Sequence, residues 1–201
     1  MKIDQKKVAI KIVAVFNIII GLFFIGISNS KHKEYTATID NKIFYKESKI
    51  VLEEAKVDVE EEIRKASVVW DDLTLDELSD KLERSMNSSL KGKGKLFATY
   101  SIELGLDPYL ALAITLHETG CAYSCSGLVK THNNLGGLKG GNGTYMSFPT
   151  LDDGIKGYLD ILYNRYYSKG LTTPEKMNPV YAQSSTWASK VNWYMNKIKA
   201  A

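Results

Sequence analysis

The chain has 201 residues, of which 44% are hydrophobic and 24% charged, enough for one domain of ordinary size and an additional segment. With 4 Pro, 15 Gly and 12 Tyr it is neither collagenous nor disordered, and 2 Cys are too few for a disulfide-built scaffold. The net charge of +3 arises within residues 1–30, and the other residues carry equal numbers of basic and acidic side chains. Phosphate binding requires clustered Lys and Arg, so the composition argues against dedicated nucleic-acid binding.

Residues 12–27 are almost entirely apolar, and extending this run back to residue 8 gives about 20 residues, the length that crosses a bilayer. Lys residues precede the run, which predicts a cytoplasmic N-terminus and an exported remainder. We therefore predict a single-pass membrane anchor at residues 1–30. The alternative is a cleaved signal peptide, because Gly26 and Ser28 are small residues with the spacing of a cleavage site.

Residues 31–69 are predicted to form a stalk, polar at 31–48 and helical from Lys49 to Ala66. The predicted helix is highly charged and has one narrow apolar stripe. The stripe consists of Leu52, Ala55, Val59, Ile63 and Ala66. This pattern favours a spacer helix, and the alternative is that residues 49–66 pack against a partner helix.

A mainly helical domain is predicted for residues 70–201. Thr74 and Glu77 have the spacing of a capping box, which opens a first helix, and residues 96–104 predict a second. Asp107 and Pro108 then open a helix that is apolar almost all round and therefore central and buried.

Further helices are predicted after Thr150, continuing to Gly170, after Thr173 and along the final segment. Between them, the glycine-rich segment 136–148 predicts one small β-hairpin. Three aromatic residues in these helices, Tyr158, Trp187 and Tyr194, have core spacing and are predicted to pack in the interior, whereas Tyr163, Tyr166 and Tyr167 are weaker candidates for a sugar groove.

Glu118 is the most informative residue for chemistry, because it stands at the end of the apolar helix. Burial there is predicted to desolvate the carboxyl group and let it hold a proton near neutral pH. Such a group acts as the general acid in glycoside cleavage. The alternative is a structural Glu that caps or bridges a helix end.

The order of motifs resembles the bacterial glucosaminidases of glycoside hydrolase family 73, over roughly residues 85–198. The motifs are Leu-His-Glu-Thr-Gly at 116–120, Asn-Asn-Leu-Gly-Gly-Leu-Lys-Gly at 133–140, Thr-Tyr-Met-Ser-Phe at 144–148 and Tyr-Ala at 181–182. Each motif is unspecific alone, and the ordered set carries the resemblance.

The resemblance implies a lysozyme-like helical fold that cleaves the glycan strand of peptidoglycan at N-acetylglucosamine, without a cofactor. By position, Glu118 matches the family's catalytic acid, and Tyr181 matches a tyrosine that lines the cleavage site. Tyr145 matches the hairpin aromatic residue beside the glycan groove. Asn133 and Asn134 match asparagines of the binding region that brace the hairpin. With the predicted anchor, this places the catalytic domain outside the cytoplasmic membrane.

One feature departs from the family pattern: the hairpin segment 136–148 contains no carboxylate, whereas many relatives have a second one there. Asp152 and Asp153 are predicted to be first-turn acids of a helix. The attacking water is then held by Tyr181, or the substrate's acetamido group attacks, or an anhydro product forms. A lytic transglycosylase or muramidase, and a non-catalytic wall-binding module, remain as alternative functions.

The pair His117-Glu118 does not predict a zinc site, because the second histidine of a zinc-protease helix is replaced by Cys121. Cys121 and Cys125 are four residues apart, so a turn can bring them within disulfide range in an exported domain. A disulfide is the favoured prediction, and two free thiols are the alternative.

Overall fold

The computed structural model describes residues 37–201, with side chains from residue 45, and the predicted membrane segment at 1–30 lies outside this range. The chain divides into two compact units between Ser67 and Val68. Within the described range, no helix is sufficiently long and apolar to span a bilayer.

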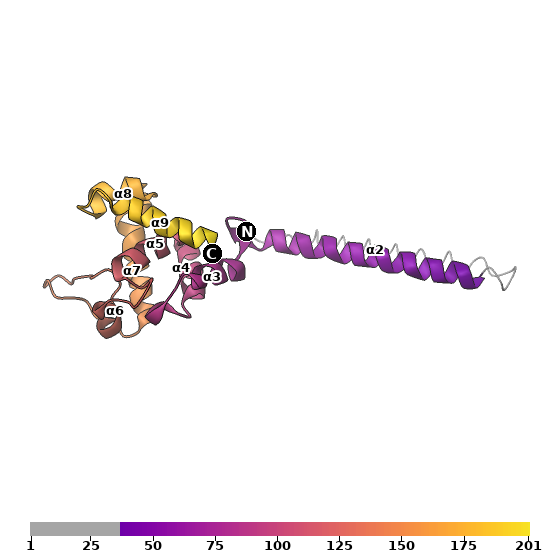
Figure 1. Ribbon diagram of the computed structural model, residues 1–201, viewed down its shortest axis with the longest axis horizontal. Coiled ribbons are helices and arrows are strands. Elements are labelled where there is room, and N and C mark those ends of the chain that lie inside the picture. The colour runs from indigo at the N-terminus through magenta and orange to yellow at the C-terminus, as the bar shows by residue number, and fades with distance from the viewer. Residues whose placement is uncertain (1–36) are drawn as a thin grey trace. The chain divides into compact units, whose positions relative to one another are not determined.

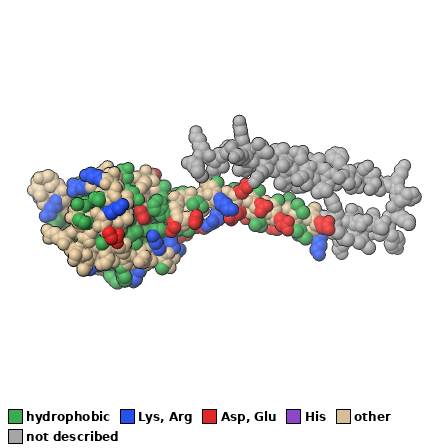
Figure 2. Space-filling model, turned by 90° about the horizontal axis from the view of Figure 1, so that it is seen from above, with side chains coloured by type: hydrophobic (Ala, Val, Ile, Leu, Met, Phe, Trp, Pro, Cys, Tyr) green, Lys and Arg blue, Asp and Glu red, His purple; other side chains and the backbone are tan. Residues whose placement is uncertain are grey.

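The first unit contains helix α2, Ala37–Ala66. It begins twelve residues before the predicted start at Lys49, so the polar stretch at 37–48 is also helical. The segment has neither Pro nor Gly, the residues that interrupt helices. A helix that has started can therefore continue through it without needing an apolar face. Acidic and basic side chains are both present along it (Figure 2), and Lys65 pairs with Glu61 at 3.4 Å.

The second unit is mainly helical, as predicted, with a small two-stranded antiparallel sheet. The strands are β1, Val68–Trp70, and β2, Leu73–Thr74, joined through Asp71 and Asp72. Both aspartates have positive φ, 49° and 59°, the backbone conformation of a tight hairpin turn.

The first half of the second unit forms around two capped helices. The predicted capping box is confirmed, with Thr74 and Glu77 bonded reciprocally at the start of α3. Asp107 likewise accepts from the backbone of Tyr109 at 2.8 Å at the start of α5. The elements of this half are α3 Leu75–Arg84, η1 Ser88–Leu90, α4 Gly94–Leu104, α5 Pro108–Thr119 and α6 Gly127–His132.

The second half supplies the helices that complete the core. Thr150 and Thr173 cap α7 and α8 as expected, but α7 ends at Arg165 rather than running to Gly170. Tyr166 leaves the helical conformation there and a 3₁₀ turn follows. The elements are α7 Leu151–Arg165, η2 Tyr167–Lys169, α8 Pro174–Tyr181 and α9 Trp187–Ala200.

Helix α5 is the centre of the second unit, and α4 and α9 pack against it (Figure 1). Every residue from Pro108 to Leu116 is buried, which confirms the prediction of a central helix. Gly120 ends α5 with a φ of 65°, a left-handed conformation that suits glycine. The last turn, with Glu118, therefore emerges from the core at a defined point.

The predicted hairpin at 136–148 is present as a turn with a single antiparallel bridge, between Lys139 and Tyr145. The prediction of paired strands is therefore wrong in extent, and the true sheet lies at residues 68–74. Glycines dominate the turn, and they offer no side chains for cross-strand packing.

Candidate active site

Glu118 lies in the last turn of α5, and its side chain is exposed to solvent. The expectation that the helix end buries this carboxylate is therefore wrong. The core covers the apolar residues up to Leu116 and also Thr119, whereas the side chain of Glu118 lies on the outer face of the last turn. The carboxylate is nevertheless held, because Oε1 accepts a hydrogen bond of 2.9 Å from Nε1 of Trp187.

Aromatic rings of three elements meet beside this carboxylate. The ring of Tyr181, at the end of α8, lies 4.6 Å from that of Trp187 and 5.0 Å from that of Tyr166. The Tyr181 hydroxyl is hydrogen-bonded to that of Tyr158 at 2.9 Å. The structure thus brings Tyr181 into the surroundings of Glu118.

The negative charge of Glu118 acts on both tyrosines. Burial, and secondly the negative charge of Glu118, raise the pKa of Tyr181. Burial is also the largest cause of a raised pKa at Tyr158, and the phenol of Tyr181 and the charge of Glu118 add to it. Both phenols therefore remain protonated at neutral pH, and each has a hydrogen to donate.

The Tyr158–Tyr181 hydrogen bond joins a buried hydroxyl to the one beside the site. Tyr158 is 2% exposed, and its hydroxyl is bonded to that of Tyr181. Either hydroxyl can be the donor in this bond. Where Tyr158 donates, the hydrogen of Tyr181 is left for a water molecule or a substrate atom.

Asn134 is fully buried, which contradicts its expected place among substrate-binding residues. Its Nδ2 donates to the carbonyls of Leu138 (2.9 Å) and Met146 (2.7 Å), and its Oδ1 accepts from the Leu138 backbone at 2.8 Å. The side chain therefore holds the two arms of the 136–148 turn together, the bracing role that the family resemblance implies.

Asn133 occupies a left-handed position, with a φ of 52°, at the end of α6. Its Nδ2 donates to the carbonyl of Phe148 at 2.9 Å. Its own carbonyl lies so close to Gly154 of α7 that a Cβ at that glycine would overlap it. Asn133 is half-buried, and a substrate contact remains a prediction.

The turn is also fixed against the aromatic cluster through Gly136. This residue has a φ of 86°, and a Cβ there would lie 2.5 Å from the ring of Tyr158. The base of the turn therefore lies directly on the tyrosine that bonds Tyr181. At the end of the turn Tyr145 is 49% exposed, with Nζ of Lys139 5.3 Å from its ring centroid, so this ring is open to a ligand.

Cys121 and Cys125 are disulfide-bonded, with their Cα atoms 3.9 Å apart. The bond closes the loop that follows Glu118, and Ser126 returns to the end of α5 by donating to the Thr119 carbonyl at 2.8 Å. Ser88 also donates to the Ser124 carbonyl at 3.1 Å. The disulfide and these two hydrogen bonds therefore fix the loop at residues 120–126 against the rest of the second unit.

Neither of the aspartates after the turn is placed as a second catalytic carboxylate. Asp152 is paired with Nζ of Lys93 at 2.6 Å, and Asp153 accepts from Oγ1 of Thr150 at 2.7 Å. His117 packs against the ring of Tyr194, with centroids 6.1 Å apart. Among residues 45–201, no group of three or more His, Cys, Asp or Glu side chains is arranged to hold a metal ion.

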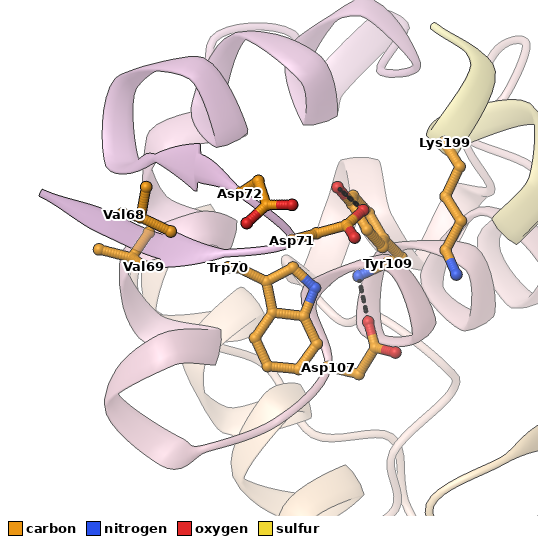
Figure 3. Close-up of a pocket in the computed structure, with 8 residues that line it drawn as sticks. All are labelled: Val68, Val69, Trp70, Asp71, Asp72, Asp107, Tyr109 and Lys199. Atoms are coloured by element: carbon orange, nitrogen blue, oxygen red, sulfur yellow. Dashed lines mark hydrogen bonds between the residues drawn. The ribbon is translucent and has the colours of Figure 1, made fainter. Parts of the chain in front are cut away.

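A pocket of about 550 Å³ lies at the other end of α5 (Figure 3). Along α5, nine residues separate Glu118 from Tyr109 in the pocket lining, a rise of about 14 Å. Its polar groups have structural partners: Asp107 caps α5, and the Tyr109 hydroxyl donates to Asp71 at 3.2 Å. Burial raises the pKa of Asp107, an effect opposed by the backbone hydrogen bonds it accepts. We infer that the residues of this pocket serve to hold the β1–β2 hairpin against α5.

Sequence reasoning placed Trp187 and Tyr158 in the core only. Both are buried, but Trp187 also bonds Glu118, and Tyr158 bonds the tyrosine beside it. The sequence indicated these contacts only through residue type, because a buried indole N–H or phenol hydroxyl requires a polar partner. Which partner it has depends on the approach of α9 to α5.

The fold and the site together define a helical domain that presents one carboxyl group among aromatic rings, an arrangement suited to acid catalysis on sugars. Residues 94–200 match the glucosaminidase family model, described as mannosyl-glycoprotein endo-beta-N-acetylglucosaminidase. The chain belongs to this family. The comparison with curated proteins finds no match.

Solved structures of S. aureus autolysin E are similar to this chain. One is 18% identical with a TM-score of 0.48, and the similarity covers 64% of this chain and 66% of that one. A complex of autolysin E with the muropeptide NAM-L-ALA-D-iGLU has the same identity and TM-score, and the similarity covers 64% and 67% of the two chains. A catalytic mutant with the disaccharide NAG-NAM is 17% identical, with a TM-score of 0.48 and coverage of 64% and 67%. The present chain thus spans about two thirds of the length of these structures.

Proposed function

We propose that this protein is a peptidoglycan hydrolase that cleaves the glycan strand at N-acetylglucosamine, an endo-beta-N-acetylglucosaminidase with a lysozyme-like fold. Membership of the glucosaminidase family supports the reaction class. The observation that carries the proposal is the placement of Glu118, held by Trp187 at the end of a buried helix and bordered by Tyr181. The resemblance of the ordered motifs to family 73 supports peptidoglycan as the substrate.

In the proposed reaction, Glu118 donates its proton to the glycosidic oxygen as the bond from that oxygen to the sugar C1 breaks. The sugar develops oxocarbenium character. Either water attacks C1 and releases a proton to solvent, or the substrate's acetamido oxygen attacks C1 and water then opens the ring that forms, releasing a proton to the Glu118 carboxylate. Asp152 and Asp153 have structural partners, so the hydroxyl of Tyr181 is the group of the described site that we assign to orienting the attacking atom.

The test is the analysis of products from purified cell walls by mass spectrometry. New reducing ends at N-acetylglucosamine support the proposal. Reducing ends at N-acetylmuramic acid identify a muramidase, and anhydro ends identify a lytic transglycosylase. Binding to walls without any released product would show a non-catalytic wall-binding module.

Tyr181→Phe is expected to lower kcat by at least about 10-fold, which corresponds to about 1.4 kcal/mol of lost transition-state stabilisation. The substitution keeps the ring that packs on Trp187 and removes the hydroxyl. Tyr158→Phe is the matched control, because it removes the other hydroxyl of the same hydrogen bond at a fully buried position. Near-normal kcat with a lowered melting temperature in Tyr181→Phe would assign the hydroxyl to packing alone.

We also propose that residues 1–30 anchor the protein in the cytoplasmic membrane, with the N-terminus inside and the catalytic domain outside. The length and apolarity of residues 8–27 and the Lys residues before them support this topology. Helix α2, with 30 residues, is about 45 Å long and is suited to hold the domain away from the membrane. Its stretch 49–66 is also the candidate contact for a partner helix.

Protease added to intact spheroplasts is expected to remove the domain at residues 68–201 and leave a short membrane-bound fragment. Full protection of the domain would contradict the topology. Sequencing the mature N-terminus separates the two export routes, because a terminus near Asn29 would show a cleaved signal peptide instead of an anchor.

A further inference from the structure

One oxygen of the Glu118 carboxyl group is held by a side chain that sequence reasoning assigned to packing. Nε1 of Trp187 donates to Oε1 of Glu118 at 2.9 Å. Trp187 is only 3% exposed, and its ring lies 4.6 Å from that of Tyr181. The bond therefore joins a buried donor to a carboxyl group at the surface.

The donor is fixed by the loop between α8 and α9. Asn178 donates from Nδ2 to the Ser184 carbonyl at 2.9 Å and accepts from the Ala188 backbone at 3.2 Å. Helix α9 begins at Trp187, and its buried residues Val191 and Ile198 belong to the same core as α5. The indole is therefore placed by the packing of α9 on α5 and by the loop bonds of Asn178.

The chemistry of the indole distinguishes the two oxygens of Glu118. An indole N–H is a donor and cannot accept a hydrogen bond, so the oxygen it contacts must be the acceptor. A protonated carboxyl group accepts more strongly through its carbonyl oxygen than through its hydroxyl oxygen, so the bond from Trp187 favours the hydrogen of protonated Glu118 on Oε2. We propose that Trp187 is a positioning residue, which holds Oε1 and so makes Oε2 the atom that donates the catalytic proton.

This inference rests on the proposed hydrolysis and names the atoms of its first step. The proton leaves Oε2 for the glycosidic oxygen, the bond from that oxygen to C1 breaks, and Glu118 is left as a carboxylate. A hydrogen bond is stronger to a charged acceptor than to a neutral one. Starting from protonated Glu118, the bond from Trp187 therefore strengthens as the proton leaves. An interaction that strengthens between that state and the transition state raises kcat rather than substrate binding.

The test replaces the indole N–H while keeping its shape. Trp187 is substituted by 3-benzothienylalanine, in which sulfur takes the place of the N–H group, in the full chain in detergent. We expect kcat on purified peptidoglycan to fall about 10- to 100-fold, with KM and the melting temperature unchanged. The same substitution at Trp70, at the opposite end of α5, is the control and is expected to leave kcat unchanged.

A kcat within threefold of wild type for the Trp187 variant would overturn the inference, as would a rise in KM with kcat unchanged. Wild-type protein that releases no glycan ends would instead count against the proposed function. An NMR measurement tests the bond without activity, using the indole N–H signals of the 3 Trp. Glu118→Ala is expected to move the Trp187 signal upfield and leave that of Trp70 in place, and an unmoved Trp187 signal would show that the bond is absent in solution.

Discussion

Replacing Glu118 with Gln is expected to lower the rate of wall hydrolysis by about 10²–10⁴-fold, the usual loss when a general acid is removed. An amide has no proton to donate to the glycosidic oxygen. Its carbonyl oxygen still accepts from Nε1 of Trp187, so the side chain remains in place and the domain remains folded. The measurement is the initial rate of glycan cleavage, alongside the melting temperature of both proteins.

The matched control for this substitution is Glu103→Gln. Glu103 is also an exposed glutamate on a core helix, α4, and it has no place in the site. It is expected to keep wild-type activity. Cleavage by the Glu118 variant within threefold of wild type would refute the assignment of the catalytic acid, and a loss shared by both variants would point to a general effect of charge.

Replacing Asn134 with Ala is expected to lower the free energy of unfolding by about 2–4 kcal/mol, since three buried hydrogen bonds are lost at about 1 kcal/mol each. The carbonyls of Leu138 and Met146 and the backbone N–H of Leu138 are left without that partner. Urea denaturation measures the effect. Asn134→Asp is expected to be similarly damaging, because a carboxylate accepts from Leu138 but donates to neither carbonyl.

Asn142→Ala is the control within the same turn. Asn142 is exposed, and its Oδ1 accepts from the backbone and the hydroxyl of Thr144, so its loss is expected to change stability by about 0.5 kcal/mol or less. Equal stability of the Asn134 and Asn142 variants would show that the turn does not depend on the buried amide. Hydrogen exchange of the Leu138 amide then reports whether the turn opens locally.

The helices of the second unit were predictable because the residue patterns that specify them extend over only a few residues. The Thr74–Glu77 capping box, the Asp107 cap and the unbroken apolar run of α5 depend on short-range hydrogen bonds and on helical spacing. The disulfide between Cys121 and Cys125 was also predictable, since the two cysteines are four residues apart.

The hairpin prediction failed in extent for a definite reason. Glycine-rich segments adopt many turns, and what selects one of them here is the side chain of Asn134, which bonds both arms from the buried side. Alternation of residues at 144–148 predicted a strand, but a strand requires a partner with side chains to pack. The short sheet at residues 68–74 was not predicted, because its five strand residues are too few to show an alternation of apolar and polar side chains.

The sequence by itself determined a helical domain with a carboxyl group at the end of a buried helix, and its ordered motifs pointed to the glucosaminidase family. Only the tertiary structure decided that Glu118 is exposed, that Trp187 holds one of its oxygens, and that Tyr158 and Tyr181 share a hydrogen bond beside it. The physical reason is distance along the chain. Glu118 and Trp187 are 69 residues apart, and their contact depends on how α9 packs on α5, which no local pattern encodes.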